Sequence, residues 1–304
     1  MRKLALAVPA GLVVLVLGAC GAGGPGDSEV ATPPASTPAP AAERVYEADT
    51  LVLERRGGLG HPRHGPMLCL GGVLLSYPPQ CGDVPIANWD WGAVAGEETA
   101  SGASWGQYHV VGTYDGEIFA VTDVGPHRDD SPQFGSEVDF SSPCPEPAGG
   151  WVLPDPKQAT QQEASGASGY AESQPDIVNS WVTHLDPANP GETRLDEFDP
   201  VIFNAVFAGD VERHEAEIRK RWPGPLCVIE GEGPTKKKLS RIRADVEAYV
   251  TGELGLQMLG SSTGVVEPVI EIGVVIDPEG TGQAALDARW PGIVRLFPAL
   301  RPAG

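Results

Sequence analysis

The stretch GASWG at residues 102–106 has the residue types for covalent catalysis, because it fits the G-x-S-x-G pattern of a serine nucleophile. Such a serine needs a strand before it and a helix after it, so that its hydroxyl lies exposed on a sharp turn. Ser104 instead follows a Gly/Ala/Ser loop and precedes a predicted hairpin strand. We therefore expect no catalytic role for Ser104.

The tripeptide His127-Arg128-Asp129 is similar to the catalytic-loop motif of protein kinases. That motif requires an asparagine five residues after the aspartate, and this position is Phe134. No glycine-rich phosphate loop accompanies the tripeptide. We interpret the match as chance, and no catalytic residue is predicted anywhere in the chain.

Two stretches offer ligands for a metal ion. His61 and His64 lie close together in a Gly/Pro-containing loop, but a zinc site needs at least one further protein ligand. The acidic side chains of LDEFD, residues 195–199, lack the glycine and terminal glutamate of a calcium-binding EF-hand loop. We expect a surface loop and a solvated turn respectively, and we predict neither a metal nor a cofactor.

The candidate ligand-binding site is Trp89-Asp90-Trp91. On a strand the two indoles would share one face, as a sugar-binding platform requires. A small β domain also needs aromatic side chains to fill its core, so core packing is the alternative interpretation.

The N-terminus predicts export and lipid anchoring. A cationic start is followed by an apolar run that is too short to span a bilayer, which is typical of a signal peptide, residues 1–19. The sequence LGAC ending at Cys20 resembles the lipobox of bacterial lipoproteins. The resemblance implies cleavage before Cys20, acylation of its thiol and a location at the outer face of the cytoplasmic membrane. Residues 20–44 would then form a Pro/Ala/Gly tether with a reach of at most about 70 Å.

The acidic net charge argues against nucleic acid as a partner. Removing residues 1–19 lowers the formal charge from −20 to −22, because that segment contains two basic and no acidic residues. Phosphate contacts need lysine and arginine, which are sparse here. They are concentrated between residues 219 and 243, in a window that we interpret as solvated helix faces. The alternative is a basic face for anionic lipids or wall polymers.

Four cysteines remain after acylation: Cys69, Cys81, Cys144 and Cys227. In an exported chain an even number predicts two disulfides, with three possible connectivities. We favour Cys69–Cys81, which closes a short loop and leaves Cys144–Cys227. A zinc site is disfavoured because paired C-x-x-C spacings are absent.

Residues 45–144 are predicted to form a small β-rich disulfide domain, a closed or half-closed barrel. Asp115-Gly116 lies between two β-rich segments and predicts a two-residue hairpin turn. Residues 64–91 read HGPMLCLGGVLLSYPPQCGDVPIANWDW, which resembles a segment of uncharacterised exported lipoproteins of actinobacteria, written HGPxLCLGxVxxSxPPQCGGP followed by GWDW. The chain departs from that pattern at Asp83-Val84 and at Asn88. The resemblance supports export and implies no established activity.

Residues 145–174 are rich in Pro, Gly, Ala, Ser and Gln, and we expect a linker or a long surface excursion there. Residues 175–304 contain a repeat: the segments 201–230 and 269–300 each read as strand, Asp, helix, Arg-Trp-Pro-Gly and strand. Asp210 and Asp277 are expected helix N-caps, and Trp222 and Trp290 are expected core residues. The predicted fold class is α+β: a small β-rich N-terminal domain, followed by an α+β sandwich of two βαβ repeats with helices on one face of a mixed sheet.

These features favour a membrane-anchored envelope lipoprotein that binds or scaffolds another envelope protein or a wall polymer, without catalysis. The alternatives are an extracytoplasmic hydrolase that uses carboxylates and an inhibitor or chaperone-like module. In the last case the loop between Cys69 and Cys81, stiffened by Pro78 and Pro79, would insert into a partner.

Overall fold

The structure is a computed structural model that describes residues 44–57, 64–74, 76–128, 134, 138–152, 161–185 and 201–304. It has a mixed α+β architecture with 23% helix and 38% strand in several sheets, so the predicted fold class is confirmed. The expectations for the signal peptide, Cys20, the tether, His61 and the acidic cluster at 195–199 lie outside the described residues.

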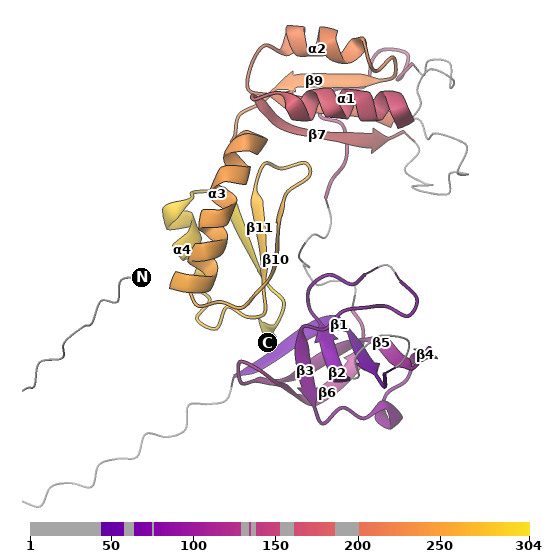
Figure 1. The fold of residues 1–304 in the computed structure, drawn as a ribbon, viewed down its shortest axis with the longest axis vertical. Helices are drawn as coiled ribbons and strands as arrows, with labels where there is room; N and C mark the ends of the chain where they lie inside the picture. The colour runs from indigo at the N-terminus through magenta and orange to yellow at the C-terminus, as the bar shows by residue number, and fades with distance from the viewer. Residues whose placement is uncertain are drawn as a thin grey trace, which may run out of the picture. The chain divides into compact units, whose positions relative to one another are not determined.

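The N-terminal part is a closed β-barrel. Strand β1 pairs with both β2 and β5, and β3 pairs with β6 in parallel, so that β1-β2-β3-β6-β5 forms a ring (Figure 1). Short strands β4 and β13 extend the sheet at β5 and β1. The strands are β1 Val45–Arg55, β2 His64–Cys69, β3 Val84–Ala87, β4 Glu98–Ala100, β5 Ala103–Tyr114, β6 Phe119–Pro126 and β13 Arg301–Pro302.

The hairpin between β5 and β6 is confirmed, but its turn is longer than two residues. Asp115 to Ile118 form the connection, and the Asp115 carboxylate accepts hydrogen bonds from the backbone N–H groups of Glu117 (2.8 Å) and Ile118 (2.7 Å). This Asx-type bonding satisfies the turn locally, so the longer connection costs little. Gly116 has φ of 105°, as the sequence implies for this position.

The rest of the chain is built from two copies of an αββαβ unit (Figure 1). In each copy the first two strands are antiparallel and the last two are parallel, joined by a helix. The predicted βαβ repeat is thus present and is part of a larger unit. Copy 1 contains α1 Gln161–Ser173, β7 Ile177–His184, β8 Val201–Phe207, α2 Val211–Arg219 and β9 Leu226–Glu230; copy 2 contains α3 Lys236–Ala248, η2 Tyr249–Glu253, β10 Met258–Thr263, β11 Ile270–Val274, α4 Gly282–Arg289 and β12 Val294–Pro298.

Three expectations for this region are corrected. The 145–174 segment is not only a linker, because α1 occupies its second half and buries Ala167 and Ala171 against the copy 1 sheet. The copies form two separate three-stranded sheets rather than one mixed sheet. The final strand β13 belongs to the barrel sheet through its pairing with β1, so the domain that begins at residue 175 does not keep the whole C-terminus.

The two aspartates predicted as N-caps behave differently from the expectation. Asp210 occupies the N-cap position of α2, but its side chain makes no capping hydrogen bond. The N-cap of α4 is Thr281, while the Asp277 carboxylate accepts the backbone N–H of Gly282 at 2.8 Å. Asp277 therefore satisfies a free N–H of the helix from outside the cap position.

The two tryptophans of the repeats are packing residues. Trp222 is fully buried and its indole N–H donates to the carbonyl of Pro225 at 2.7 Å. Trp290 is half-buried and packs edge-on against Tyr249, with ring centroids 5.5 Å apart. Among the helices of the described part, none is long and apolar enough to cross a membrane.

Candidate functional site

The predicted Trp-Asp-Trp platform is a packing cluster at one end of the barrel core. Trp91 begins a short 3₁₀ helix, Trp91–Ala93, and the Asp90 carboxylate caps it by accepting the N–H of Gly92 at 2.8 Å. The residues are not on a strand, so the indoles do not share a face. They meet edge-to-face with centroids 5.4 Å apart, and both are half-buried against the barrel core. This geometry fits the core interpretation.

Tyr108 lies under both tryptophans and leaves a polar atom buried. Its ring centroid is 5.2 Å from that of Trp89, and only 4% of the residue is exposed. Its hydroxyl has no hydrogen-bond partner among the described residues. Burial, assisted by the nearby Glu97 carboxylate, raises the pKa of Tyr108 above its usual value of 10.0.

The described residues of the catalytic and metal motifs do not assemble into sites. Ser104 is buried within β5, and its hydroxyl lies 3.3 Å from that of Thr99 on the neighbouring strand β4. His64 begins β2, and its Nδ1 lies 2.8 Å from the carbonyl of the next residue, Gly65. Within the described ranges no three His, Cys, Asp or Glu side chains come together in a way that could hold a metal ion.

The Cys69–Cys81 disulfide closes a loop on the side of β1 and β5 that faces away from the barrel core, and hydrogen bonds brace this loop. The Cα atoms are 5.5 Å apart, as this bond requires. Inside the loop the backbone N–H of Leu74 donates to the carbonyl of Gln80 at 3.0 Å, and the buried Arg55 guanidinium donates to the carbonyl of Pro79 at 2.9 Å. The loop is therefore held by a covalent bond at its base and by hydrogen bonds near its tip.

The tip of this loop exposes apolar side chains. Leu74 is 64% exposed and Tyr77 is 76% exposed, and the neighbouring Val73 is 40% exposed. The Tyr77 ring packs edge-on against Trp105 of β5 at 5.4 Å, which orients the ring without burying it. Large apolar side chains grouped on a braced loop are typical of a contact surface for another molecule.

A buried ionic cluster lies on the same outer face, farther along β1 and β5. The carboxylate of Asp49, whose side chain is 1% exposed, is 3.1 Å from Nδ1 of His109 and accepts the backbone N–H of Arg128 at 2.8 Å. His127 and Arg301 approach the same carboxylate at 3.9 and 3.8 Å. A buried carboxylate requires such partners, because desolvation of an unpaired charge is costly. Asp49 therefore connects β1, β5 and the C-terminal strand β13.

The loop and the ionic cluster border one cavity of about 260 Å³. Its polar wall contains Asp49, Gln107, His127 and Arg301, and its apolar wall includes Leu70 and Val73 from the disulfide loop together with residues of copy 2. This face of β1 and β5, with the loop and the cavity, is the candidate functional site, and below it is called the outer face. A mixed lining of this kind suits a side chain or a small group with one polar end.

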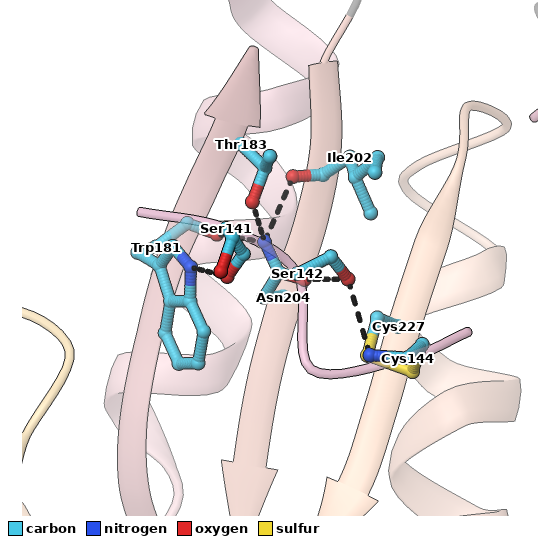
Figure 2. The surroundings of a disulfide bond; sticks show 8 residues. All are labelled: Ser141, Ser142, Cys144, Trp181, Thr183, Ile202, Asn204 and Cys227. Carbon is cyan, nitrogen blue, oxygen red and sulfur yellow. Dashed lines mark hydrogen bonds between the residues drawn. A yellow bond between two sulfur atoms is a disulfide. The ribbon is translucent and has the colours of Figure 1, made fainter. Parts of the chain in front are cut away.

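The second disulfide, Cys144–Cys227, holds a segment across the copy 1 sheet (Figure 2). The segment, residues 138–144, is called the strap. The Phe140 carbonyl accepts the Thr183 hydroxyl on β7, the Ser142 hydroxyl donates to Asn204 on β8 at 2.7 Å, and Cys144 is bonded to β9. Residues two apart in the strap thus contact successive strands. Both favoured disulfides are present.

Comparison with protein-family models, with curated proteins and with solved structures finds no match for this chain.

Sequence reasoning missed most of the outer face. Asp49, His109 and Arg301 come from three strands that are far apart in the chain, and no local motif links them. One signal was available: on β1, the residues that alternate towards the outer face change from charged to apolar, from Glu47 and Asp49 to Leu51 and Leu53. This mixture of charged and apolar residues indicates that other parts of the protein cover some of this face of β1 and leave the rest in solvent.

Proposed function

We propose that the chain is a lipid-anchored protein at the outer face of the cytoplasmic membrane, and that it binds another envelope protein without catalysing a reaction. The observation that carries the binding role is the disulfide-closed loop 69–81, which holds Leu74 and Tyr77 exposed in a braced conformation. The lipid anchor rests on the lipobox sequence before Cys20. We further propose membership of the actinobacterial exported family whose characteristic segment spans residues 64–91, because that segment supplies β2, the loop and the Trp89–Trp91 cluster.

A braced loop supports this role on energetic grounds. Ordering a flexible side chain or loop on binding costs about 0.5–1.5 kcal/mol per side chain, and a preformed loop avoids much of that cost. Burying an exposed leucine fully contributes about 1.5–3 kcal/mol. Two exposed side chains such as Leu74 and Tyr77 can therefore supply a substantial share of a micromolar affinity, which is about 8 kcal/mol. An inhibitor or chaperone-like role would be one form of this binding.

The binding role is tested by chemical cross-linking in cells that express the full chain. We expect the double variant Leu74→Ser/Tyr77→Ser to lose the dominant cross-linked species. The matched control is Ile118→Ser/Val152→Ser, which removes two other exposed apolar side chains and should keep it. A species that persists in the loop variant would contradict the assignment of the loop.

The anchor is tested separately by metabolic labelling with palmitate. Label should enter the wild-type chain and should be absent from Cys20→Ala, which lacks the proposed acylation site. Label in the variant, or none in either chain, would contradict lipidation at Cys20 and would leave the binding result unaffected.

A hydrolase is the second candidate, and the Asp49 cluster favours it. A buried carboxylate beside His109 and His127, with His127 lining the cavity, could orient an imidazole as a general base. Incubation of purified chain with isolated cell envelope would release soluble fragments in that case, and Asp49→Asn would abolish the release. Absence of release from the wild-type chain would remove this candidate.

A further inference from the structure

The two αββαβ copies place equivalent residues at known positions. Cys227 and Arg295 each lie five residues after the tryptophan of Arg-Trp-Pro-Gly. The strand register identifies equivalent residues on the middle strands, because Cys227 pairs with Asn204 on β8 and Arg295 pairs with Glu271 on β11. On the first strands the partners are Trp181 and Ser262. The row Trp181–Asn204–Cys227 in copy 1 therefore corresponds to the row Ser262–Glu271–Arg295 in copy 2.

Both rows lie on the sheet face away from the helices. In copy 1 the alternate residues Phe203 and Ala205 pack with the helices, so Asn204 between them points to the other side. In copy 2 the same alternation places Ile270 and Ile272 in the helix-side core and Glu271 on the opposite face. The two rows therefore lie on equivalent faces of their sheets.

The copy 1 row is fully used to hold the strap, as Figure 2 shows. The Trp181 indole N–H donates to the Ser141 carbonyl at 3.3 Å, and the Asn204 side-chain oxygen accepts the Ser142 hydroxyl at 2.7 Å. Cys227 is disulfide-bonded to Cys144. Every member of the row therefore binds one segment of irregular chain that crosses the three strands.

The copy 2 row is charged and has no such segment bonded across it among the described residues. The Ser262 hydroxyl donates to the Glu271 carboxylate at 2.9 Å. The Arg295 side chain is 50% exposed and forms an ion pair with Glu267, which is 57% exposed. An exposed pair of this kind contributes little to stability, so another ion can replace it at low cost.

A cavity of about 480 Å³ lies beside this row. Glu271, Arg295 and Phe297 line it on the copy 2 side, and Ser141 and Trp181 line it on the strap side. The next part of the same face is already covered by Phe134, whose ring is 6.2 Å from that of Phe297. The cavity therefore lies over Glu271 and Arg295 of the row, next to the part of the face that Phe134 covers.

We propose that the copy 2 row is a binding site for an extended polypeptide segment of a partner protein, which crosses β10, β11 and β12 as the strap crosses the copy 1 strands. Charge complementarity defines the ligand. The residue opposite Glu271 is a lysine or arginine, and the residue two positions away, opposite Arg295, is an aspartate or glutamate. The two-residue spacing follows from the strap, in which Ser142 meets β8 and Cys144 meets β9. Phe297 lines both this cavity and the cavity of the outer face, but the row Ser262–Glu271–Arg295 contains no residue of the outer face. The proposed site does not depend on lipid anchoring.

The test uses three pools of acetylated heptapeptide amides and the full-length chain in detergent micelles. The pools are X-X-Lys-X-Asp-X-X, X-X-Asp-X-Lys-X-X and X-X-Ser-X-Ser-X-X, where X is a mixture of uncharged residues, and binding is measured by competition with a fluorescent member of the tightest pool. Because the chain direction sets the order of the charges, we expect one charged pool to bind at least tenfold more tightly than the serine pool. A tenfold preference is about 1.4 kcal/mol, within reach of two charge-assisted contacts.

The variant Glu271→Gln/Arg295→Gln should remove this preference. Its matched control is Arg44→Gln/Glu279→Gln, which neutralises another exposed ion pair (55% and 72% exposed) and should keep the preference. Charged pools that bind no better than the serine pool would overturn the proposal, and so would a preference that survives in the Glu271→Gln/Arg295→Gln variant. The wild-type comparison alone is decisive, so the proposal stays testable even if a variant fails to fold.

Discussion

The two disulfides give a quantitative prediction for the free energy of unfolding. They close loops of very different length, but their cysteines are buried to a similar extent. Cys69–Cys81 spans a sequence separation of 12 residues and Cys144–Cys227 a separation of 83. Each bond joins one buried and one half-buried cysteine, so replacement by alanine removes a similar amount of packing in both cases. The difference between the two double-alanine variants therefore reports mainly on loop length.

The expected magnitude follows from the entropy of closing a loop in the unfolded chain. For these separations the loop-entropy relation gives about 2.8 kcal/mol for Cys69–Cys81 and about 4.5 kcal/mol for Cys144–Cys227. Cys144→Ala/Cys227→Ala should thus lower the free energy of unfolding by about 1.7 kcal/mol more than Cys69→Ala/Cys81→Ala. The strap would also lose its covalent attachment to β9, which adds to the larger loss.

The assay is urea unfolding of the wild-type chain and both variants, followed by far-ultraviolet circular dichroism under non-reducing conditions. Reduction of the wild-type chain provides the sum of both effects. Equal losses, or a larger loss for the short loop, would refute the argument that both bonds act mainly through the unfolded state.

Three further predictions test the barrel and the strap. Tyr108→Phe removes a buried hydroxyl without a partner among the described residues and should stabilise the fold by about 1 kcal/mol in urea unfolding. Burial raises the pKa of Tyr108 in the folded chain, so just above pH 10 the Tyr108 hydroxyl loses its proton only in the unfolded chain, and this lowers the stability of the wild type. The variant lacks this hydroxyl and should therefore lose less stability than the wild type as the pH rises past 10. Gly112→Ala should cost more than about 2 kcal/mol, because its Cβ would lie 2.1 Å from the Ala120 carbonyl oxygen, whereas Gly65→Ala meets nothing within 4 Å and should express and melt nearly as the wild type does. Asn204→Ala should cost about 2–3 kcal/mol and should increase hydrogen exchange in the strap, because a fully buried amide that bonds both the strap and β7 is lost.

The elements that could be predicted were those with local signals. The Arg-Trp-Pro-Gly repeats predicted two βαβ units, which the structure contains, and Asp115-Gly116 predicted a hairpin. Helix α1 could not be predicted from its composition, because Gly166, Gly169 and several serines lower its helix propensity. Only Ala167 and Ala171 are buried, and it is their packing on the copy 1 sheet that stabilises the helix.

The outer face could not be predicted because it depends on pairings between distant segments. The cluster around Asp49 requires the β1–β5 register, which pairs Asp49 with His109, and the β1–β13 pairing, which brings Arg301 from the C-terminus. The cysteine spacing did indicate the loop 69–81, but the exposure of Leu74 and Tyr77 depends on hydrogen bonds within it. The Trp89–Trp91 platform was wrong in geometry, because Asn88 has φ of 55° and ends the preceding strand.

The most direct test of the binding role is site-specific photo-cross-linking in intact cells. A photoreactive amino acid is placed at Tyr77 or, as a control, at Ile118, another exposed apolar side chain of the barrel. We expect one dominant cross-linked envelope protein from position 77 and none of that species from position 118. No protein adduct from position 77, or the same adducts from both positions, would contradict the proposal that loop 69–81 is a protein-binding surface.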